Sequence, residues 1–268
     1  MGIVNVTPDS FSDGGSYASV DDAVKHGIQM VSDGADLLDV GGESTRPGSD
    51  PVSADEELAR VVPVIQRLTH ELPDTPVSVD TRKAEVARSA MEVGAAIVND
   101  ITAGADPDMF QIVRQAQAGM VLMHMKGEPK TMQEDPTYYD VVAEVRGSLG
   151  ERLEEAVAAG IGMDQLCIDP GLGFGKTLAH NLAILHDIDE LHHLEVPVLV
   201  GPSRKRFIGA LTDAEVDDRL EGTAGVVAWC AARGVDIVRV HDVKEMLQVC
   251  RVADAVVRGW RRPQDGVV

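Results

Sequence analysis

The chain has 268 residues, of which 44% are hydrophobic and only 3% aromatic, so aliphatic side chains and alanine must fill its core. Its formal net charge is −20, and such a charge repels phosphate backbones and anionic lipids, which argues against nucleic acid or a membrane surface as a partner. The cysteines lack the spacing of a disulfide framework or a zinc site. No signal peptide or membrane-spanning apolar run is recognised, so we expect a soluble cytoplasmic protein.

Short apolar runs alternate with longer alanine-rich stretches along the chain. The runs predict strands at residues 2–6, 36–40, 77–79, 95–98, 119–123, 165–168, 196–200 and 236–240. The stretches between them predict helices at residues 20–33, 54–72, 84–93, 108–117, 140–159, 179–191, 220–233 and 243–257. Glycine often follows a helix, where a C-cap favours it, as at Gly34, Gly94, Gly119, Gly160 and Gly234.

This strict alternation of strand and helix predicts an α/β protein with a parallel sheet. The number of units and the chain length fit a closed (β/α)8 TIM barrel, a single domain over residues 1–260 followed by a polar tail at residues 261–268. A doubly wound open sheet is the alternative. The lack of a Rossmann glycine fingerprint after the first strand counts weakly against it.

The carboxyl end of every predicted strand carries polar or charged residues, beginning with the opening stretch MGIVNVTPDSFSDGG. In such a barrel the active site lies at these strand ends. Loops are polar in any case, so chance accounts for several of the ends. Polar residues at all of them favour a shared site.

A set of cations is predicted at this mouth. Arg239 and His241 are two residues apart, so they share one face of the last strand, and Lys205 follows the strand before it. Further arginines belong to the same loops: Arg46, Arg204 and Arg206. In an acidic protein this clustering indicates a phosphate-bearing or otherwise anionic substrate. For any single arginine, a surface salt bridge is an equally good explanation.

Two carboxylates, Asp80 and Asp169, end strands that look buried, where an ionised group needs hydrogen-bond donors. A ring with a guanidine-like pair of N–H groups would supply these donors. Asn99 would read a mixed donor and acceptor edge of the same ring. The alternative for each aspartate is a helix cap, or a pair with Arg82 or Lys176.

Three loop features complete the sequence-based site. The segment DPGLGFGKT, residues 169–177, lacks the P-loop spacing, so its glycines are interpreted as letting the backbone approach a flat ligand. Within it, Phe174 is either an apolar wall or loop packing. GGESTRPG, residues 41–48, has the composition of a mobile lid. Asn5 is a neutral oxygen ligand that suits a Mg²⁺ ion shared with a diphosphate, whereas His124 is interpreted as structural.

The chain resembles the dihydropteroate synthases, the folate-pathway enzymes of the pterin-binding TIM-barrel family. The resemblance covers nearly the whole chain and rests on ordered motifs: MGIVNVTPDSFSDGG, DVGGESTRPGS, SVDT, NDI, MHMKG-P-TMQ, DPGLGFGKT, GPSRKRFIG and VRVHDV. It implies the condensation of 6-hydroxymethyl-7,8-dihydropterin diphosphate with 4-aminobenzoate, giving 7,8-dihydropteroate and diphosphate. It also implies Mg²⁺ as the cofactor, a homodimer, and competition by sulfonamides.

The resemblance also implies a role for each matching residue. The catalytic set would be Asp80, Asp169, Lys205, Arg239 and His241. The pterin would be bound by Asp80, Asn99, Met123, Asp169, Lys205 and Arg239. The diphosphate would meet Asn5, Arg46, Arg239 and His241, with Asn5 as the metal ligand. The aminobenzoate site and its mobile loops would use Phe11, Asp13, Thr45, Arg46, Pro47, Phe174 and Ser203. We expect a cation at the pterin methylene, favoured by the two aspartates, and amine attack without a strong base.

Two departures and two other functions stay open at this point. Family members usually carry residues before the first strand, so we expect the plug that these form at the base of the barrel to be missing or replaced. Arg206 stands where some members have serine, which affects the aminobenzoate contacts.

A methyltransferase-type pterin domain acting on a corrinoid would not need the STRPG loop or the diphosphate residues. A binding-only paralogue would have lost some of them.

Overall fold

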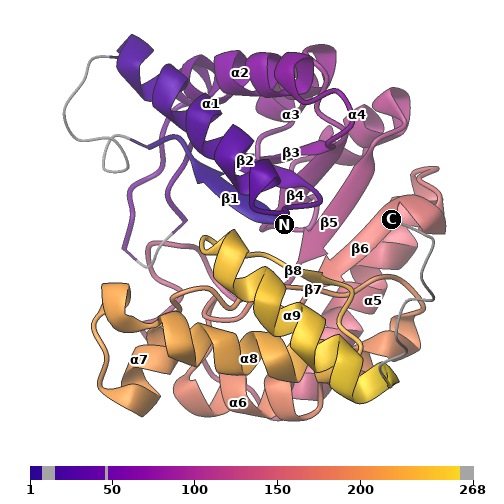
Figure 1. Cartoon of the computed structure of the whole chain (residues 1–268). Coiled ribbons are helices and arrows are strands. Elements are labelled where there is room, and N and C mark those ends of the chain that lie inside the picture. The colour runs from indigo at the N-terminus through magenta and orange to yellow at the C-terminus, as the bar shows by residue number, and fades with distance from the viewer. Residues whose placement is uncertain (8–15, 46–47, 260–268) are drawn as a thin grey trace.

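The computed structural model describes residues 1–7, 16–45 and 48–259. Its elements follow one another as β1 (Gly2–Asn5), α1 (Ser16–Ser32), β2 (Leu38–Gly41), α2 (Ala54–Glu71), β3 (Val77–Asp80), α3 (Ala84–Glu92), β4 (Ile97–Asp100), α4 (Met109–Ala116), β5 (Gly119–Met123), α5 (Val141–Ala158), β6 (Leu166–Asp169), α6 (Leu178–His186), β7 (Leu199–Val200), α7 (Arg206–Thr212), α8 (Leu220–Ala232), β8 (Ile237–Val238) and α9 (Val243–Arg258). Figure 1 shows the helices arranged around the outside of the strands.

The strands close into a barrel. Parallel pairing runs from β1 to β6 without a break, and β7 pairs with β8. Single parallel bridges join the two groups, Ile168 to Val198 on one side and Gly2 to Val240 on the other. The Ile3 amide also donates to the Val240 carbonyl at 3.0 Å. The predicted (β/α)8 barrel is therefore confirmed, with sparser pairing at two seams.

Four details differ from the predicted elements. The helix expected at residues 179–191 is divided, because α6 ends at His186 and a 3₁₀ segment, Ile188–Leu194, follows. The seven-residue helix α7 lies between β7 and α8, where the apolar periodicity is too short to reveal it. Strands β7 and β8 are shorter than their apolar runs. The C-cap role expected of Gly119 is wrong, because Gln117 ends α4 in the left-handed conformation and Gly119 begins β5.

The core has two parts. Most buried aliphatic side chains lie between the strands and the surrounding helices. A smaller cluster contains Met1, Val121, Cys167 and Leu199, and it fills the inside of the barrel. Val121 and Cys167 each precede by two positions the residue that ends the strand, so they lie beneath the strand ends.

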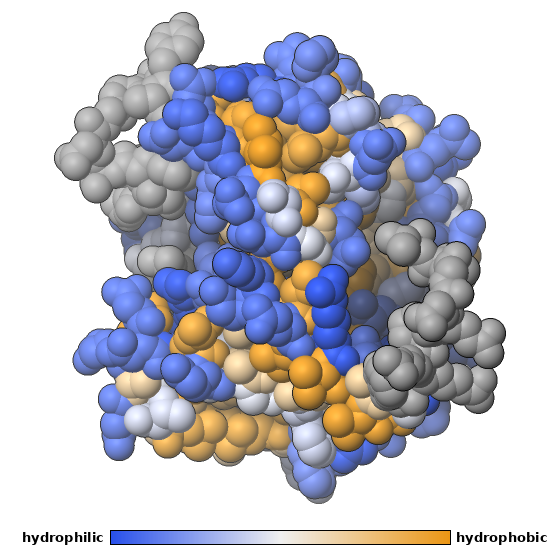
Figure 2. Space-filling view, in the orientation of Figure 1, coloured by the Kyte–Doolittle hydropathy of each residue, from blue (hydrophilic) through white to orange (hydrophobic). Residues whose placement is uncertain are grey.

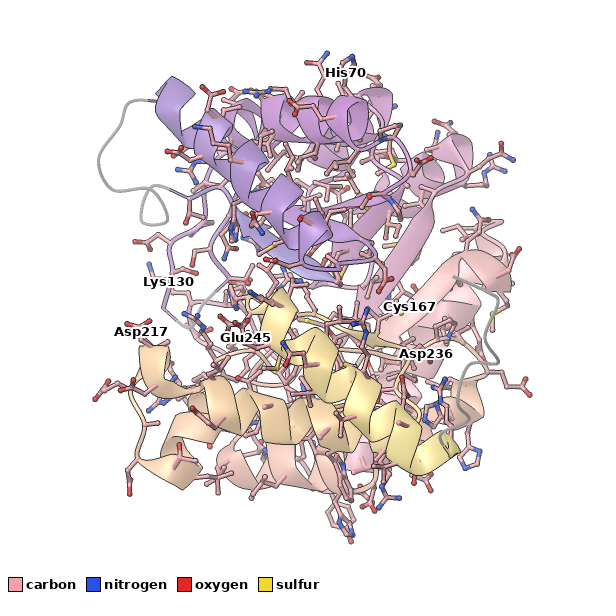
Figure 3. The ribbon with its side chains drawn as sticks, viewed as in Figure 1. His70, Lys130, Cys167, Asp217, Asp236 and Glu245 are labelled. Atoms are coloured by element: carbon pink, nitrogen blue, oxygen red, sulfur yellow. The ribbon has the colours of Figure 1, made fainter. Side chains whose placement is uncertain are left out.

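The mouth and the base of the barrel lie at opposite ends. Figure 3 shows Lys130, from the loop after β5, and Asp217, from the segment between α7 and α8, on the left of the view, with Cys167 and Asp236 on the right. The predicted tail, residues 261–268, lies outside the described residues. Within the described ranges, none of the helices combines the length and apolarity needed to cross a membrane.

Candidate active site

Four side chains meet inside the mouth of the barrel, around Arg239. Its Nε donates to Oδ2 of Asp39 at 2.6 Å, and its Nη2 donates to Oδ2 of Asp80 at 2.7 Å. The Nδ2 of Asn99 donates to the same Asp39 oxygen at 3.0 Å. Because β8 pairs with none of the strands that carry these partners, the contacts must cross the interior. The predicted residues Asp80, Asn99 and Arg239 are thus brought together.

Asp39 joins this group although sequence reasoning does not single it out. It lies within β2 and is fully buried. An acid at such a position is costly unless it is paired with a cation and with hydrogen-bond donors, and here it has both. The signal that could have found it is the lone acid inside the apolar run LLDVGG.

A second group lies at the end of β6 and in the loop after β7. Oδ1 of Asp169 accepts a hydrogen bond from the Gly171 amide at 2.7 Å. The Nζ of Lys205 lies 4.3 Å from the centroid of the Phe174 ring, a distance at which an ammonium is attracted to the ring face. Burial raises the pKa of Asp169, and the nearby charges of Lys205 and Arg239 oppose that rise. The two groups therefore share one side of the molecule.

Burial moves the pKa values of two oppositely charged residues at the mouth toward neutral pH. It raises the pKa of Asp80 to about 7, although the Arg239 charge works in the other direction. It lowers the pKa of Lys205 to about 8, opposed by Asp169. Keeping both groups ionised in the empty site therefore costs free energy, and a ligand with matching polar groups would reduce that cost.

His241 is held between β1 and the loop after β7. The Oγ of Ser203 lies 2.9 Å from Nδ1 of His241 and accepts from the His241 amide at 3.2 Å. Nδ2 of Asn5 lies 3.5 Å from Nε2 of the same ring. The predicted residues Asn5, Ser203 and His241 thus form one contact group. Arg239 lies two positions before His241 in the chain.

The glycines of residues 169–177 do not all have the role that the sequence predicts for them. Gly171 and Gly175 have φ values of 66° and 62°, and a Cβ at either position would collide with a backbone oxygen of His124 or Lys126. They let the loop after β6 pack against the loop after β5, so the idea that they admit a flat ligand is wrong for this pair. Only Gly173 faces Lys205, at ordinary contact distance.

Lys176 fastens the same two loops. Its Nζ lies 2.9 Å from Nδ1 of His124 and donates to the carbonyls of His124 and Phe174 at 3.2 and 3.0 Å. Burial, together with the Lys176 charge, lowers the pKa of His124 to about 3. Burial also lowers the pKa of Lys176, to about 7. The imidazole is therefore neutral and lies in hydrogen-bond contact with Nζ of Lys176, which agrees with the interpretation of His124 as structural. The hydrogen bonds of Lys176 thus go to His124 and Phe174, whereas the alternative explanation from the sequence pairs Lys176 with Asp169.

Comparison with known proteins gives a consistent result. The family described as pterin binding enzyme matches residues 1–241. Dihydropteroate synthase of Escherichia coli strain K12 is 47% identical over 257 residues, 96% of this chain and 91% of that protein. The Yersinia pestis dihydropteroate synthase, solved as a sulfonamide drug complex, superposes with a TM-score of 0.92 at 44% identity, covering 97% of this chain and 94% of that one. The Xanthomonas albilineans enzyme with 4-aminobenzoic acid gives 0.91 at 47% identity, covering 97% and 93%.

The chain belongs to the dihydropteroate synthase family of pterin binding enzymes.

Two further residues of the predicted site, Met123 and Thr45, lie within the described part of the chain. Met123 ends β5 and is buried opposite Asp169 in the strand register. Thr45, the second residue of the STRPG segment, is half-buried. The remaining predicted loop residues lie outside the described residues: Phe11, Asp13, Arg46 and Pro47.

Of the predicted cations Arg204 and Arg206, the first is held in a salt bridge and the second is exposed. Nε and Nη2 of Arg204 bind the carboxylate of Asp242 at 3.1 and 2.7 Å, so the salt-bridge explanation holds for this arginine. Arg206 is exposed on α7. Arg82, the alternative partner of Asp80, instead donates to Glu43 at 3.0 Å.

Proposed function

We propose that the mouth of this barrel condenses 6-hydroxymethyl-7,8-dihydropterin diphosphate with 4-aminobenzoate, giving 7,8-dihydropteroate and diphosphate. One observation carries the proposal: at the carboxyl ends of the barrel strands Asp80 pairs with Arg239 at 2.7 Å, and Asp169 is close enough to Lys205 for their charges to interact. Such a surface complements a heterocycle that has both N–H donors and a carbonyl acceptor.

The two aspartates would bind the N–H groups of the pterin, and Asn99 the adjoining ring edge. The hydrogen bond from Asn99 to Asp39 fixes the amide orientation, which leaves Oδ1 to accept from the ligand. Lys205 would donate to the pterin carbonyl. Because the guanidinium of Arg239 already holds two carboxylates, we assign it to the ring plane and to orienting the acids. The diphosphate would then be bound mainly by the residues around His241.

The chemistry breaks the bond from the pterin methylene to the diphosphate oxygen and forms a bond to the aminobenzoate nitrogen. The electron pair of the broken bond leaves with diphosphate, and the ring delocalises the resulting cation. Asp80 and Asp169, once ionised, favour that positive charge. The arylamine attacks as the neutral amine and afterwards loses one proton, so no strong base is required.

Mg²⁺ fits this site as an ion that arrives with the diphosphate. Among the residues the structure describes, no three or more His, Cys, Asp or Glu side chains gather as metal ligands. Asn5 offers one neutral oxygen at the mouth, which suits a hydrated ion shared with phosphates. When bound, the ion would supply charge neutralisation for the leaving group.

The second substrate would lie outside the pterin, near Phe174 and Ser203. The aminobenzoic acid and sulfonamide complexes of the Xanthomonas and Yersinia enzymes support this choice of ligand. We therefore propose that sulfonamides compete with aminobenzoate here as well.

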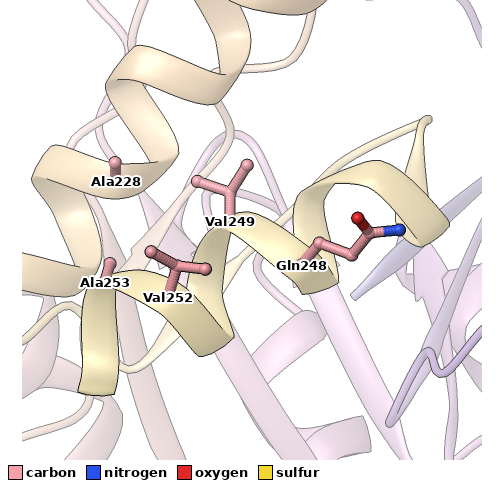
Figure 4. A pocket seen from close by; sticks show the side chains of 5 residues that line it. All are labelled: Ala228, Gln248, Val249, Val252 and Ala253. Atoms are coloured by element: carbon pink, nitrogen blue, oxygen red, sulfur yellow. The ribbon is translucent and has the colours of Figure 1, made fainter. Parts of the chain in front are cut away.

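We also propose that the chain forms a homodimer through α8 and α9. A groove of about 340 Å³ lies between these helices (Figure 4), lined by Ala228, Gln248, Val249, Val252 and Ala253. Val252 in the groove is 65% exposed, and Val256, one turn further along α9, is 78% exposed. Figure 2 shows hydrophobic residues gathered over this lower part of the molecule. An apolar surface of this kind marks an association site.

The decisive experiment is a coupled assay of diphosphate release from the pterin substrate, with and without 4-aminobenzoate. We expect release to depend on aminobenzoate and to be inhibited competitively by a sulfonamide. The Asp80→Asn and Asp169→Asn variants should each lose at least about a hundredfold in kcat/KM, on the scale of one lost electrostatic contact in a dry site.

Other outcomes identify the alternatives. Pterin binding without diphosphate release would indicate a binding-only paralogue. Methyl transfer from methyltetrahydrofolate to a corrinoid, again without diphosphate release, would indicate the methyltransferase. Near-native turnover in both aspartate variants would contradict the cation mechanism.

A further inference from the structure

Arg204, the residue before Lys205, has an unusual backbone conformation. Its φ is 54°, in the left-handed region, where a residue with a Cβ is strained. Such strain persists only when the surroundings fix it, and it concentrates at functional sites. The position of this residue, directly before the proposed pterin ligand Lys205, makes its supports important.

Three side chains hold Arg204 in place. Oγ1 of Thr223, a fully buried residue of α8, accepts from the Arg204 amide at 3.1 Å. Nη1 of Arg219 donates to the Arg204 carbonyl at 3.2 Å. Asp242 binds the guanidinium through both carboxylate oxygens. The amide, the carbonyl and the side chain of one strained residue thus each have a dedicated partner.

Gly209 makes room for one of these supports. A Cβ at this position would lie 2.5 Å from Nε of Arg219, although the guanidinium must pass here to reach Arg204 and the carbonyl of Ala214. The last glycine of the GPSRKRFIG motif therefore serves the Arg219 contact.

The same contacts align two loops of the site. Ser203 and Arg204 are consecutive, and so are their partners His241 and Asp242. This pair of neighbouring contacts fixes the loop after β7 against the loop after β8. Lys205 follows directly and leads into α7, so its direction depends on the backbone of Arg204.

We propose that Arg219, Thr223 and Asp242 are positioning residues that hold Arg204 in its left-handed conformation and thereby aim Lys205 into the pterin site. The inference rests on the proposed function only in taking a pterin as the ligand of Lys205. None of the three touches the reacting atoms.

A double-mutant cycle tests whether Arg219 acts through Lys205. The probe is 6-hydroxymethylpterin, which lacks the leaving group, and its Kd is measured by titration calorimetry. We expect Arg219→Met to weaken binding about tenfold, the scale of one lost hydrogen bond to a charged group. In the Lys205→Met background, the same change should have almost no further effect. Equal losses in both backgrounds would mean a general structural role and would overturn the proposal.

A second comparison isolates the backbone. Arg204→Gly and Arg204→Ala both remove the contact with Asp242, but only glycine adopts positive φ without strain. The glycine variant should bind the probe about fivefold more tightly than the alanine variant. Equal affinities, or tighter binding by alanine, would contradict the proposal. If Arg204→Ala does not fold, Thr223→Val replaces it, with a threefold or larger loss of affinity expected, by roughly the value of one hydrogen bond.

Controls separate this inference from the proposed function. Arg258→Met removes an exposed arginine of α9 and should leave the Kd unchanged. A parent chain that fails to bind the pterin at all would contradict the proposed function. Binding by the parent with additive variant losses would contradict only the positioning role.

Discussion

Asp80 and Lys205 are poised to change charge within a narrow pH interval. The folded-state pKa of Asp80, about 7, is above its ordinary value, so the stability that its proton contributes is present at low pH and is lost as pH rises toward 7. The pKa of Lys205, about 8, is below its ordinary value, so its burial penalty is relieved as pH rises above 8. Between these values both charges are present in the empty site, at a cost to the folded state.

The affinity for a pterin should therefore follow a bell-shaped pH profile. Below about pH 7 Asp80 holds a proton and loses part of its attraction for N–H groups, and above about pH 8 Lys205 is neutral. Calorimetric Kd values for 6-hydroxymethylpterin measured across this range would show a maximum affinity between the two limbs. Asp80→Asn should abolish the acidic limb, and Lys205→Met the basic one. A profile that is flat in the parent chain would contradict the assignment.

Two of the residues proposed to bind the pterin depend on Asp39, since it accepts from both Asn99 and Arg239. The Asp39→Asn change leaves one amide oxygen for these donors and removes the charge that faces a buried guanidinium. We expect the free energy of unfolding to fall by about 3 kcal/mol, measured by urea denaturation, because a buried ion pair has lost one partner.

The matched control for this change is Asp22→Asn, on the exposed face of α1, where the carboxylate pairs with Lys25 at 3.7 Å. Exposed pairs of this kind contribute little, so its unfolding midpoint should stay within error of the parent. A similar small effect in Asp39→Asn would show that Arg239 finds sufficient partners without Asp39.

At the scale of loops, the packing of one connection against another shapes the site. The loop after β6 is joined to the loop after β5 by Nζ of Lys176 and by the hydroxyl of Tyr138, which donates to the Gly175 carbonyl at 2.8 Å. Gly171 and Gly175 permit the close approach. Phe174, under Lys205, is carried by this joined pair of loops.

Gly171→Ala and Gly173→Ala form a matched pair that tests this view. Both positions have positive φ, so each alanine costs about 1 kcal/mol from backbone strain. Only Gly171→Ala also drives a Cβ into the His124 carbonyl, for roughly 2 kcal/mol more by overpacking. We expect the larger fall in denaturation midpoint, and the larger fall in kcat/KM, at Gly171. Equal effects would mean that backbone conformation alone matters and that the loops adjust freely.

The elements also show what a sequence can and cannot predict. The period of apolar residues predicted the barrel, and with it the strand ends at Asp80 and Asp169, because each strand and helix is a local pattern. Motif resemblance added the ligand roles expected of these residues and of Lys205. Asp39, Gly171 and the supports of Arg204 were not predicted in their roles. Each depends on a partner from a distant segment, and a local pattern carries no information about that partner.

The whole molecule combines a net charge of −20 with an apolar surface on α8 and α9. Charge of one sign keeps chains apart in solution, and apolar area favours their association. The balance is set by ionic strength, because salt screens the repulsion between two acidic chains and leaves the apolar contact in place.

The proposed homodimer should therefore form more readily as salt is raised, and a single charge in the groove should prevent it. Val252→Glu places a carboxylate on an exposed side chain that lines the groove, where the proposed contact between two copies would bury it. Sedimentation velocity should show dimers of the parent at physiological salt, a shift toward monomer at low salt, and monomer for Val252→Glu under both conditions. The matched control is Val157→Glu, on the partly exposed face of α5, which should sediment like the parent. Dimers that persist in Val252→Glu would place the interface on another face of the barrel.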